Sequence, residues 1–317
     1  MEDGPQHDAP GPPSGPSRRI IDGQEPTCED IALATGSAYC YAYVELPRQA
    51  SVSQIKNYCS TTRRLFAPIA KAFKEDANSR WVLRHYLAIK FATAANLLAG
   101  SATYAYDHNL MLGVPYFNYY AVLNACRAYL MTSPHVIWDG AKTVEMTHQN
   151  ILNRTADYLR ALDPGRAPAW GRDLELLRDR RELFSYRFPL SGVGLAGEEA
   201  FEPEPAISLA RLIAELASVN SECLDASLSK HSSGEIPVRK MSDHEWASAY
   251  ELAGAQARDR DDEYRFSKLV RKWKTVSPLQ VMCSDGLMDD VYAAWSDSHE
   301  RPGAFDPDEY SRLVLAL

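Results

Sequence analysis

The sequence lacks the cysteine patterns of zinc modules and of disulfide frameworks. It has six cysteines in 317 residues, none in a Cys-x-x-Cys pair, and no cysteine–histidine cluster has the spacing of a zinc site. Cys126 and Cys223 lie in apolar helical patterns, which favours buried free thiols in a reducing compartment. We therefore expect no metal and no other cofactor.

Long apolar runs and signal-peptide features are also missing. Without a stretch long enough to cross a bilayer, we expect a soluble, cytoplasmic protein that does not enter membranes. An excess of positive charge is absent as well, since the net charge is −8, and this argues against general coating of nucleic acid. A local basic site stays compatible, because 24 of the 34 basic residues are arginines, whose forked guanidinium suits phosphate.

The motifs of several common enzyme classes are absent too. The chain has no P-loop, no Gly-x-Gly-x-x-Gly after a predicted strand and no Gly-x-Ser-x-Gly. These absences exclude the usual NTPase phosphate loop, the dinucleotide-binding turn and the nucleophile elbow of α/β-hydrolases.

Hydrophobic periodicity predicts a mainly α protein with one short N-terminal β element. In Ser37–Leu46 three tyrosines alternate with smaller residues, which is typical of a strand. The predicted divisions are 1–27 (disordered tail), 28–79 (strand and helix), 80–190 (helical bundle), 191–206 (linker or long loop rich in Gly, Glu and Pro) and 207–317 (additional C-terminal helices). The predicted helices are 52–76, 80–106, 114–132, 142–162, 172–187, 206–229, 242–273, 286–297 and 307–315.

Two arginines fall on apolar helix faces. Arg127 lies in a stripe with Tyr120 and Leu123, and Arg181 shares a face with Leu174 and Phe184. A buried guanidinium needs an acceptor, because an unpaired buried charge is costly. In a purely structural arrangement the acceptor is a carboxylate or a terminal helix carbonyl. In a binding pocket it is an anion such as phosphate. The sequence leaves both readings open.

Two further polar residues accompany these arginines. Asn124 lies between Tyr120 and Arg127 on the same helix, and buried hydrogen bonds that fix helix register would explain such a polar string. His148 projects on the same side as Val144 and Ile151, a position typical of a core histidine as well as of a general acid or base.

The same residues resemble the HEPN family, in particular its small stand-alone bacterial branch. That branch has a Tyr-Tyr-Ala helix running into Ala-Arg-Ala, then a Ser-His helix, then a helix with Arg, three residues and Asp-Tyr. The matching positions are Tyr119-Tyr120-Ala121 with Arg127-Ala128, Thr147-His148, and Arg181 with Ser185-Tyr186. Thr147 replaces the family's Ser and Ser185 its Asp. The match covers about 80–190.

The resemblance implies a four-helix up-and-down bundle, often dimeric, from toxin–antitoxin and phage-defence systems. Active members are metal-independent RNases with Arg, four to six residues and His on the last helix. Here five residues separate Arg181 from Arg187, which stands where active members have their His, and that helix contains no His. Two Arg-x4-His pairs occur elsewhere, Arg80–His85 and Arg239–His244, in a number that chance alone predicts.

Three functions are consistent with this pattern. The first, which we favour, is a non-catalytic HEPN-like protein that binds RNA or a partner protein. Its anion-binding residues would be Arg127, Arg181, Arg187, Tyr120, Tyr186 and Asn124. The second is a metal-independent RNase toxin or abortive-infection effector in which His148 and Arg181 act together. The third is a dimerising scaffold with no role in nucleic-acid binding.

Overall fold

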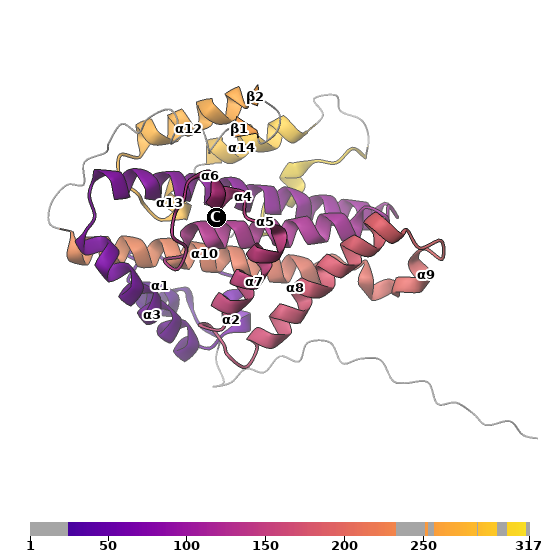
Figure 1. The fold of residues 1–317 in the computed structure, drawn as a ribbon, viewed down its shortest axis with the longest axis horizontal. Helices are drawn as coiled ribbons and strands as arrows, with labels where there is room; N and C mark the ends of the chain where they lie inside the picture. Colours follow the sequence, from indigo (N-terminus) through magenta and orange to yellow (C-terminus); the bar gives the residue numbers. More distant parts are fainter. Residues whose placement is uncertain (1–24, 233–250, 253–256, 284, 297–302, 315–317) are drawn as a thin grey trace, which may run out of the picture.

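The computed structural model describes residues 25–232, 251–252, 257–283, 285–296 and 303–314. The structure is mainly helical, so the predicted class is confirmed (Figure 1). Within the described ranges, β structure consists of β1 (Glu251–Leu252) and β2 (Ala257–Arg258), which pair antiparallel. In this part of the chain no helix combines the length and the apolar character that crossing a membrane requires.

The helices fall into long central ones and shorter peripheral ones. The long helices are α3 (Val52–Lys71), α4 (Glu75–Asp107), α5 (Val114–Thr132), α8 (Ala167–Glu182) and α10 (Glu204–His231). The shorter helices are α1 (Cys28–Thr35), α2 (Leu46–Gln49), α6 (Ala141–Val144), α7 (His148–Leu159), α9 (Val193–Ala196), α12 (Arg260–Lys272), α13 (Leu279–Met282) and α14 (Asp285–Trp295).

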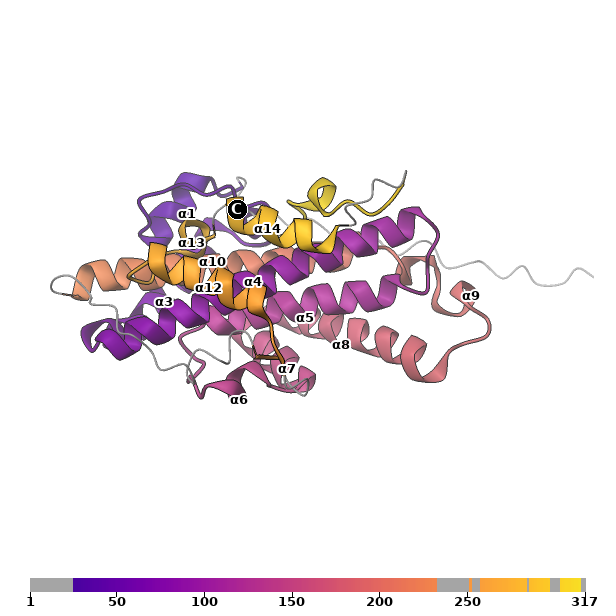
Figure 2. The same ribbon diagram turned by 90° about the horizontal axis from the view of Figure 1, so that it is seen from above.

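Helix α5 lies at the centre of the molecule. It packs against α4 on one side, α10 on another, and α7 and α8 on a third (Figures 1 and 2). Its small-residue stripe, Ala121, Ala125 and Ala128, is buried and lets neighbouring helices approach closely. Because α5 is covered on several sides, polar residues on it must find partners within the fold or face a site.

Helix α10 continues the same buried core on the other side of the segment 191–206. It packs against α3 and α5, and its Leu216 and Val219 are fully buried. The segment 191–206 itself holds α9 and a 3-10 turn (Glu198–Ala200), and its Phe201 packs edge-on against Phe184.

The strand predicted over Ser37–Leu46 is wrong. This described segment bends at residues 38–39 and 44–45 and has no strand pairing, and α2 begins at its last residue. The backbone N–H groups of Val44, Glu45 and Leu46 donate instead to the carboxylate of Glu215 on α10, at 2.5–3.0 Å. A side chain therefore satisfies the backbone where the tyrosine alternation predicted a partner strand.

Other boundaries differ because caps and turns interrupt the periodic pattern. The helix expected over 142–162 is split into α6 and α7, since the Thr147 side chain accepts a hydrogen bond from the Asn150 N–H and starts a new helix. Of the helix expected over 242–273, the described part begins only at Arg260, after β1 and β2. Helix α1 was not predicted, and the final helix is one 3-10 turn, Pro307–Tyr310.

Candidate anion-binding site

Three packed helices bring the predicted site residues together. Helix α5 carries Tyr119, Tyr120 and Arg127, α7 begins with His148, and α8 carries Arg181. Both α7 and α8 pack against α5 and against each other. The Thr147 cap fixes the first turn of α7, so His148 is held facing the middle of α5.

His148 is anchored by a tyrosine. Its Nδ1 lies 3.0 Å from the hydroxyl of Tyr119, which is buried, and its ring meets that of Tyr120 edge-on at 5.9 Å. Burial lowers the pKa of His148, and the positive charges of Arg127 and Arg181 lower it further. His148 is therefore neutral at pH 7, and both guanidiniums lie close enough to act on one imidazole.

Arg181 is surrounded by aromatic rings and hydroxyl groups. Its guanidinium donates to the hydroxyl of Tyr120 at 3.1 Å and to that of Tyr186 at 3.5 Å. The guanidinium carbon also lies 5.7 Å from the Tyr119 ring and 5.4 Å from the Tyr186 ring. Within the described residues no carboxylate forms an ion pair with Arg181, and its buried Nε has no hydrogen-bond partner.

Arg127 has even fewer partners. Its guanidinium carbon lies 5.4 Å from the Phe91 ring, its Nε is buried without a hydrogen bond, and burial lowers its pKa. Among the residues that the structure describes, it too has no ion pair. Among the described residues neither of these half-buried cations has an acid partner, so each can accept an anion.

Sequence reasoning missed Arg178. It lies one turn before Arg181 on α8, so helical spacing alone places it on the same side. Its guanidinium contacts the side-chain carbonyl of Gln149 and pairs with Asp179 at 2.8 Å. Arg178 therefore adds a cation at the edge of the site, where an acid already balances it.

Some predicted residues contribute less than expected. The amide of Asn124 donates to the Tyr120 backbone carbonyl at 2.8 Å and so serves its own helix. Tyr186 and Arg187 lie on one π-helical turn, Leu183–Arg187, that extends α8, and both are exposed. Tyr186 reaches Arg181, whereas Arg187 makes no hydrogen bond or ion pair with the described residues.

The two Arg-x4-His pairs do not build a second site. His85 is fully buried, and its Nδ1 lies 2.9 Å from the Ser277 carbonyl, so it joins α4 to the segment before α13. Arg239 and His244 lie outside the described residues.

The His148 site has no set of side chains suited to a metal. Among the described residues, one group of His, Cys, Asp or Glu donors lies close enough together to hold an ion, and it consists of Cys28, Glu29 and Cys40. That group belongs to α1 and the segment that follows it, a different part of the fold.

Comparison of the chain with protein-family models, with curated proteins and with solved structures found no match. The resemblance to the HEPN family stays a prediction.

Proposed function

We propose that the chain is a HEPN-like prokaryotic protein that binds RNA without cleaving it, through a phosphate held between Arg127 and Arg181. One observation carries the proposal: these two guanidiniums have no carboxylate partner in the described structure, and the positive charge of each lowers the pKa of His148. A phosphodiester supplies the negative charge that the site lacks, and a guanidinium fork matches its oxygens.

The surroundings suit single-stranded RNA. Tyr186 is 74% exposed beside Arg181, so a base next to the bound phosphate can stack on its ring. The net charge of −8 disfavours contacts elsewhere on the surface, and binding would be confined to this local site.

We further infer that the helices of residues 80–190, packed around α5, correspond to the HEPN-like helical bundle that the resemblance implies. A role in a defence or toxin–antitoxin system follows from that resemblance, as does assembly into a homodimer or a complex with a partner protein. Light scattering of the purified chain tests the homodimer, and a monomeric mass would reject it.

A second candidate function is metal-independent RNA cleavage. The observation that favours it is the neutral, tyrosine-bound His148 beside two guanidiniums. His148 would take the proton of the 2′-hydroxyl, whose oxygen attacks phosphorus. The arginines would stabilise the added charge, and the 5′-oxygen would leave as it takes this proton back from the His148 imidazolium.

Fluorescence anisotropy with a labelled single-stranded RNA tests the proposal. The variant Arg127→Ala/Arg181→Ala should bind more weakly by about 100-fold or more, since a hydrogen bond to a charged group contributes on the order of 1.5–3 kcal/mol. Its salt dependence should also fall by about one counterion, because the two arginines neutralise one shared phosphate. Arg172→Ala is the matched control, because it removes an exposed arginine from the same helix.

The same samples, incubated with total RNA and with tRNA in the presence of EDTA, decide between the two functions. Binding without cleavage supports the first. Cleavage that is lost in His148→Gln and in Arg181→Ala supports the second. If wild-type protein neither binds nor cleaves RNA, both are wrong and the scaffold role is left.

A further inference from the structure

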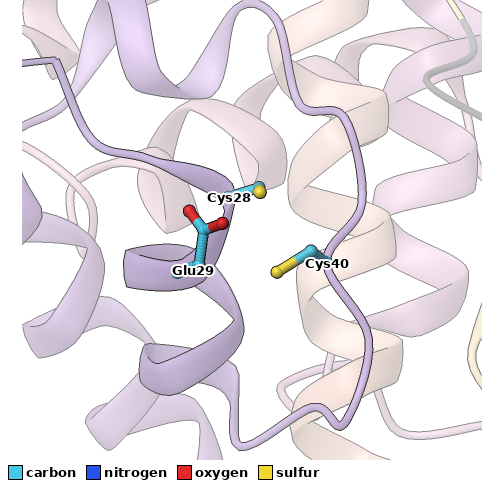
Figure 3. Close-up of side chains that lie close together, drawn as sticks. All are labelled: Cys28, Glu29 and Cys40. Carbon is cyan, nitrogen blue, oxygen red and sulfur yellow. The ribbon is translucent and has the colours of Figure 1, made fainter.

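The start of α1 brings together two thiols and a carboxylate that are separated in the sequence. Cys28 and Glu29 occupy the first turn of α1, and Cys40 belongs to the segment that passes this turn after a chain reversal (Figure 3). One sulfur from each cysteine and one oxygen of Glu29 all lie within 4.8 Å of one another. The two sulfurs point into the space between the two segments, and the Glu29 carboxylate lies at the first turn of α1 beside Cys28.

Local structure fixes the backbone on both sides of this group. Thr27 and Asp30 form a capping box, which sets where α1 begins and uses Asp30 for the helix instead of the cluster. Gly36, at φ 81°, ends α1 in a left-handed conformation, and its N–H donates to the Ala32 carbonyl at 2.9 Å. This turn directs residues 37–40 back along the helix.

The segment beyond Cys40 is anchored as well. The Tyr43 hydroxyl contacts the carboxylate of Glu222, and the N–H of Val44 donates to Glu215 at 2.7 Å. Cys40 therefore sits between a fixed turn and a fixed docking point on α10. Neither backbone segment has to rearrange for the three donors to close on an ion.

From this geometry we propose that Cys28, Cys40 and Glu29 bind one Zn²⁺, with water as the fourth ligand. Thiolates and a carboxylate are ligands that Zn²⁺ takes in tetrahedral geometry, at about 2.3 Å for sulfur and about 2.1 Å for oxygen. These bond lengths place neighbouring donors about 3.6–3.8 Å apart in a tetrahedron. The observed separations require the donors to approach by about 1 Å at most, which side-chain rotation supplies.

The position of the cluster determines how the ion reaches it and what it does. Cys28 is half-buried, whereas Glu29 and Cys40 are exposed, so the ion reaches the donors directly from solvent. Once bound, it links the first turn of α1 to the segment that docks on α10. Zn²⁺ therefore stabilises the N-terminal part of the fold, and it does so independently of the arginine site.

Titration of the reduced, full-length chain without an affinity tag tests this site. Co²⁺ is the spectroscopic probe, and Zn²⁺ affinity is measured by competition with a chromophoric chelator. We expect one ion per chain, thiolate-to-cobalt charge-transfer absorption, the visible bands of tetrahedral Co²⁺, and a higher melting temperature with Zn²⁺. Losing a residue that only hydrogen-bonds a metal ligand typically weakens metal binding by about 10–100-fold. Because the cysteines are ligands themselves, Cys28→Ser and Cys40→Ser should each weaken Zn²⁺ binding by more than about 100-fold.

Glu29→Gln should weaken binding less than either cysteine variant and keep the charge-transfer absorption. Cys283→Ser, which removes a half-buried cysteine outside the cluster, is the matched control and should bind as wild type does. Melting curves without metal verify that the variants fold. The proposal is overturned if folded wild type binds less than one ion, or if either cysteine variant keeps wild-type affinity. A Cys28–Cys40 disulfide in a chain that binds no Zn²⁺ after reduction would also overturn it.

Discussion

Helix α5 meets buried arginines in two places, and the two differ in what surrounds the guanidinium. At its C-terminal end Arg84 donates to four backbone carbonyls, those of Met131 (2.7 Å), Ser133 (2.8 Å), Val136 (3.2 Å) and Leu130 (3.4 Å). It also lies 3.9 Å from the Trp81 ring. Beside the middle of α5, Arg127 and Arg181 have rings and hydroxyls around them, and no carbonyl or carboxylate of the described residues accepts from either guanidinium.

The difference follows from where helix carbonyls are free. The last carbonyls of a helix have no partner within it, so they accept hydrogen bonds from Arg84 and hold its charge. In the middle of α5 the carbonyls are used by the helix itself. A guanidinium at the end of α5 therefore completes the fold, whereas guanidiniums beside its middle stay available for an external anion.

The strongest way to sharpen this comparison is to remove Arg84. Arg84→Ala leaves buried carbonyls without donors and removes charge-assisted hydrogen bonds, so we expect a loss of about 3–5 kcal/mol in the free energy of unfolding. Arg181→Ala should cost less than about 1 kcal/mol, because Arg181 has no ion pair to lose in the part of the chain that the structure describes. Urea unfolding measures both, and equal losses would break the distinction.

Glu222 on α10 extends the comparison to a buried acid that already has partners. It accepts from the Thr35 hydroxyl at 2.7 Å and from Tyr43, but burial raises its pKa to about 7. A raised acid pKa means that the folded state binds more protons than the unfolded state between about pH 4.5 and 7. The free energy of unfolding should therefore fall across that window as pH rises, by about 3 kcal/mol.

Glu222→Gln removes the titrating group and keeps an acceptor for Thr35. Urea unfolding should show that the free energy of unfolding falls less between pH 5 and pH 7.5 in the variant than in wild type. If the free energy of unfolding falls by the same amount in the variant as in wild type, Glu222 does not titrate in this range.

How much of this could be foreseen depends on the residue. Helical periodicity placed α4, α5 and α10 well, because long apolar stripes determine them. It placed Arg127 and Arg181 on apolar helix faces. It could not predict that backbone carbonyls surround Arg84 whereas rings and hydroxyls surround the other two guanidiniums, because the carbonyls left free depend on where helices end and pack. The Glu215 contacts that replace the predicted strand join residues far apart in the sequence. Cys28 and Cys40 lie close together because the chain reverses between them. Hydrophobic periodicity contains no information on either arrangement.

The smallest expected effect concerns His148. Its lowered pKa keeps it neutral at pH 7, and it gains a positive charge as pH falls below its usual range. RNA binding should therefore tighten by about threefold as the pH falls from 7.5 through the range in which His148 gains its proton, an increment typical of one partly solvated charge. Anisotropy titrations should show no such change in His148→Gln. The same tightening in that variant would assign it to another group.

The central claim is that Arg127 and Arg181 share one anion, and arginine side-chain NMR tests it most directly. The Nε–H signals of Arg127, Arg181 and Arg84, assigned from Arg→Lys variants, would be followed while a short single-stranded RNA is added to the full chain. We predict that the signals of Arg127 and Arg181 shift together along one binding curve while that of Arg84 stays in place. If the first two stay unchanged, or shift along different curves, the arginines do not form one site.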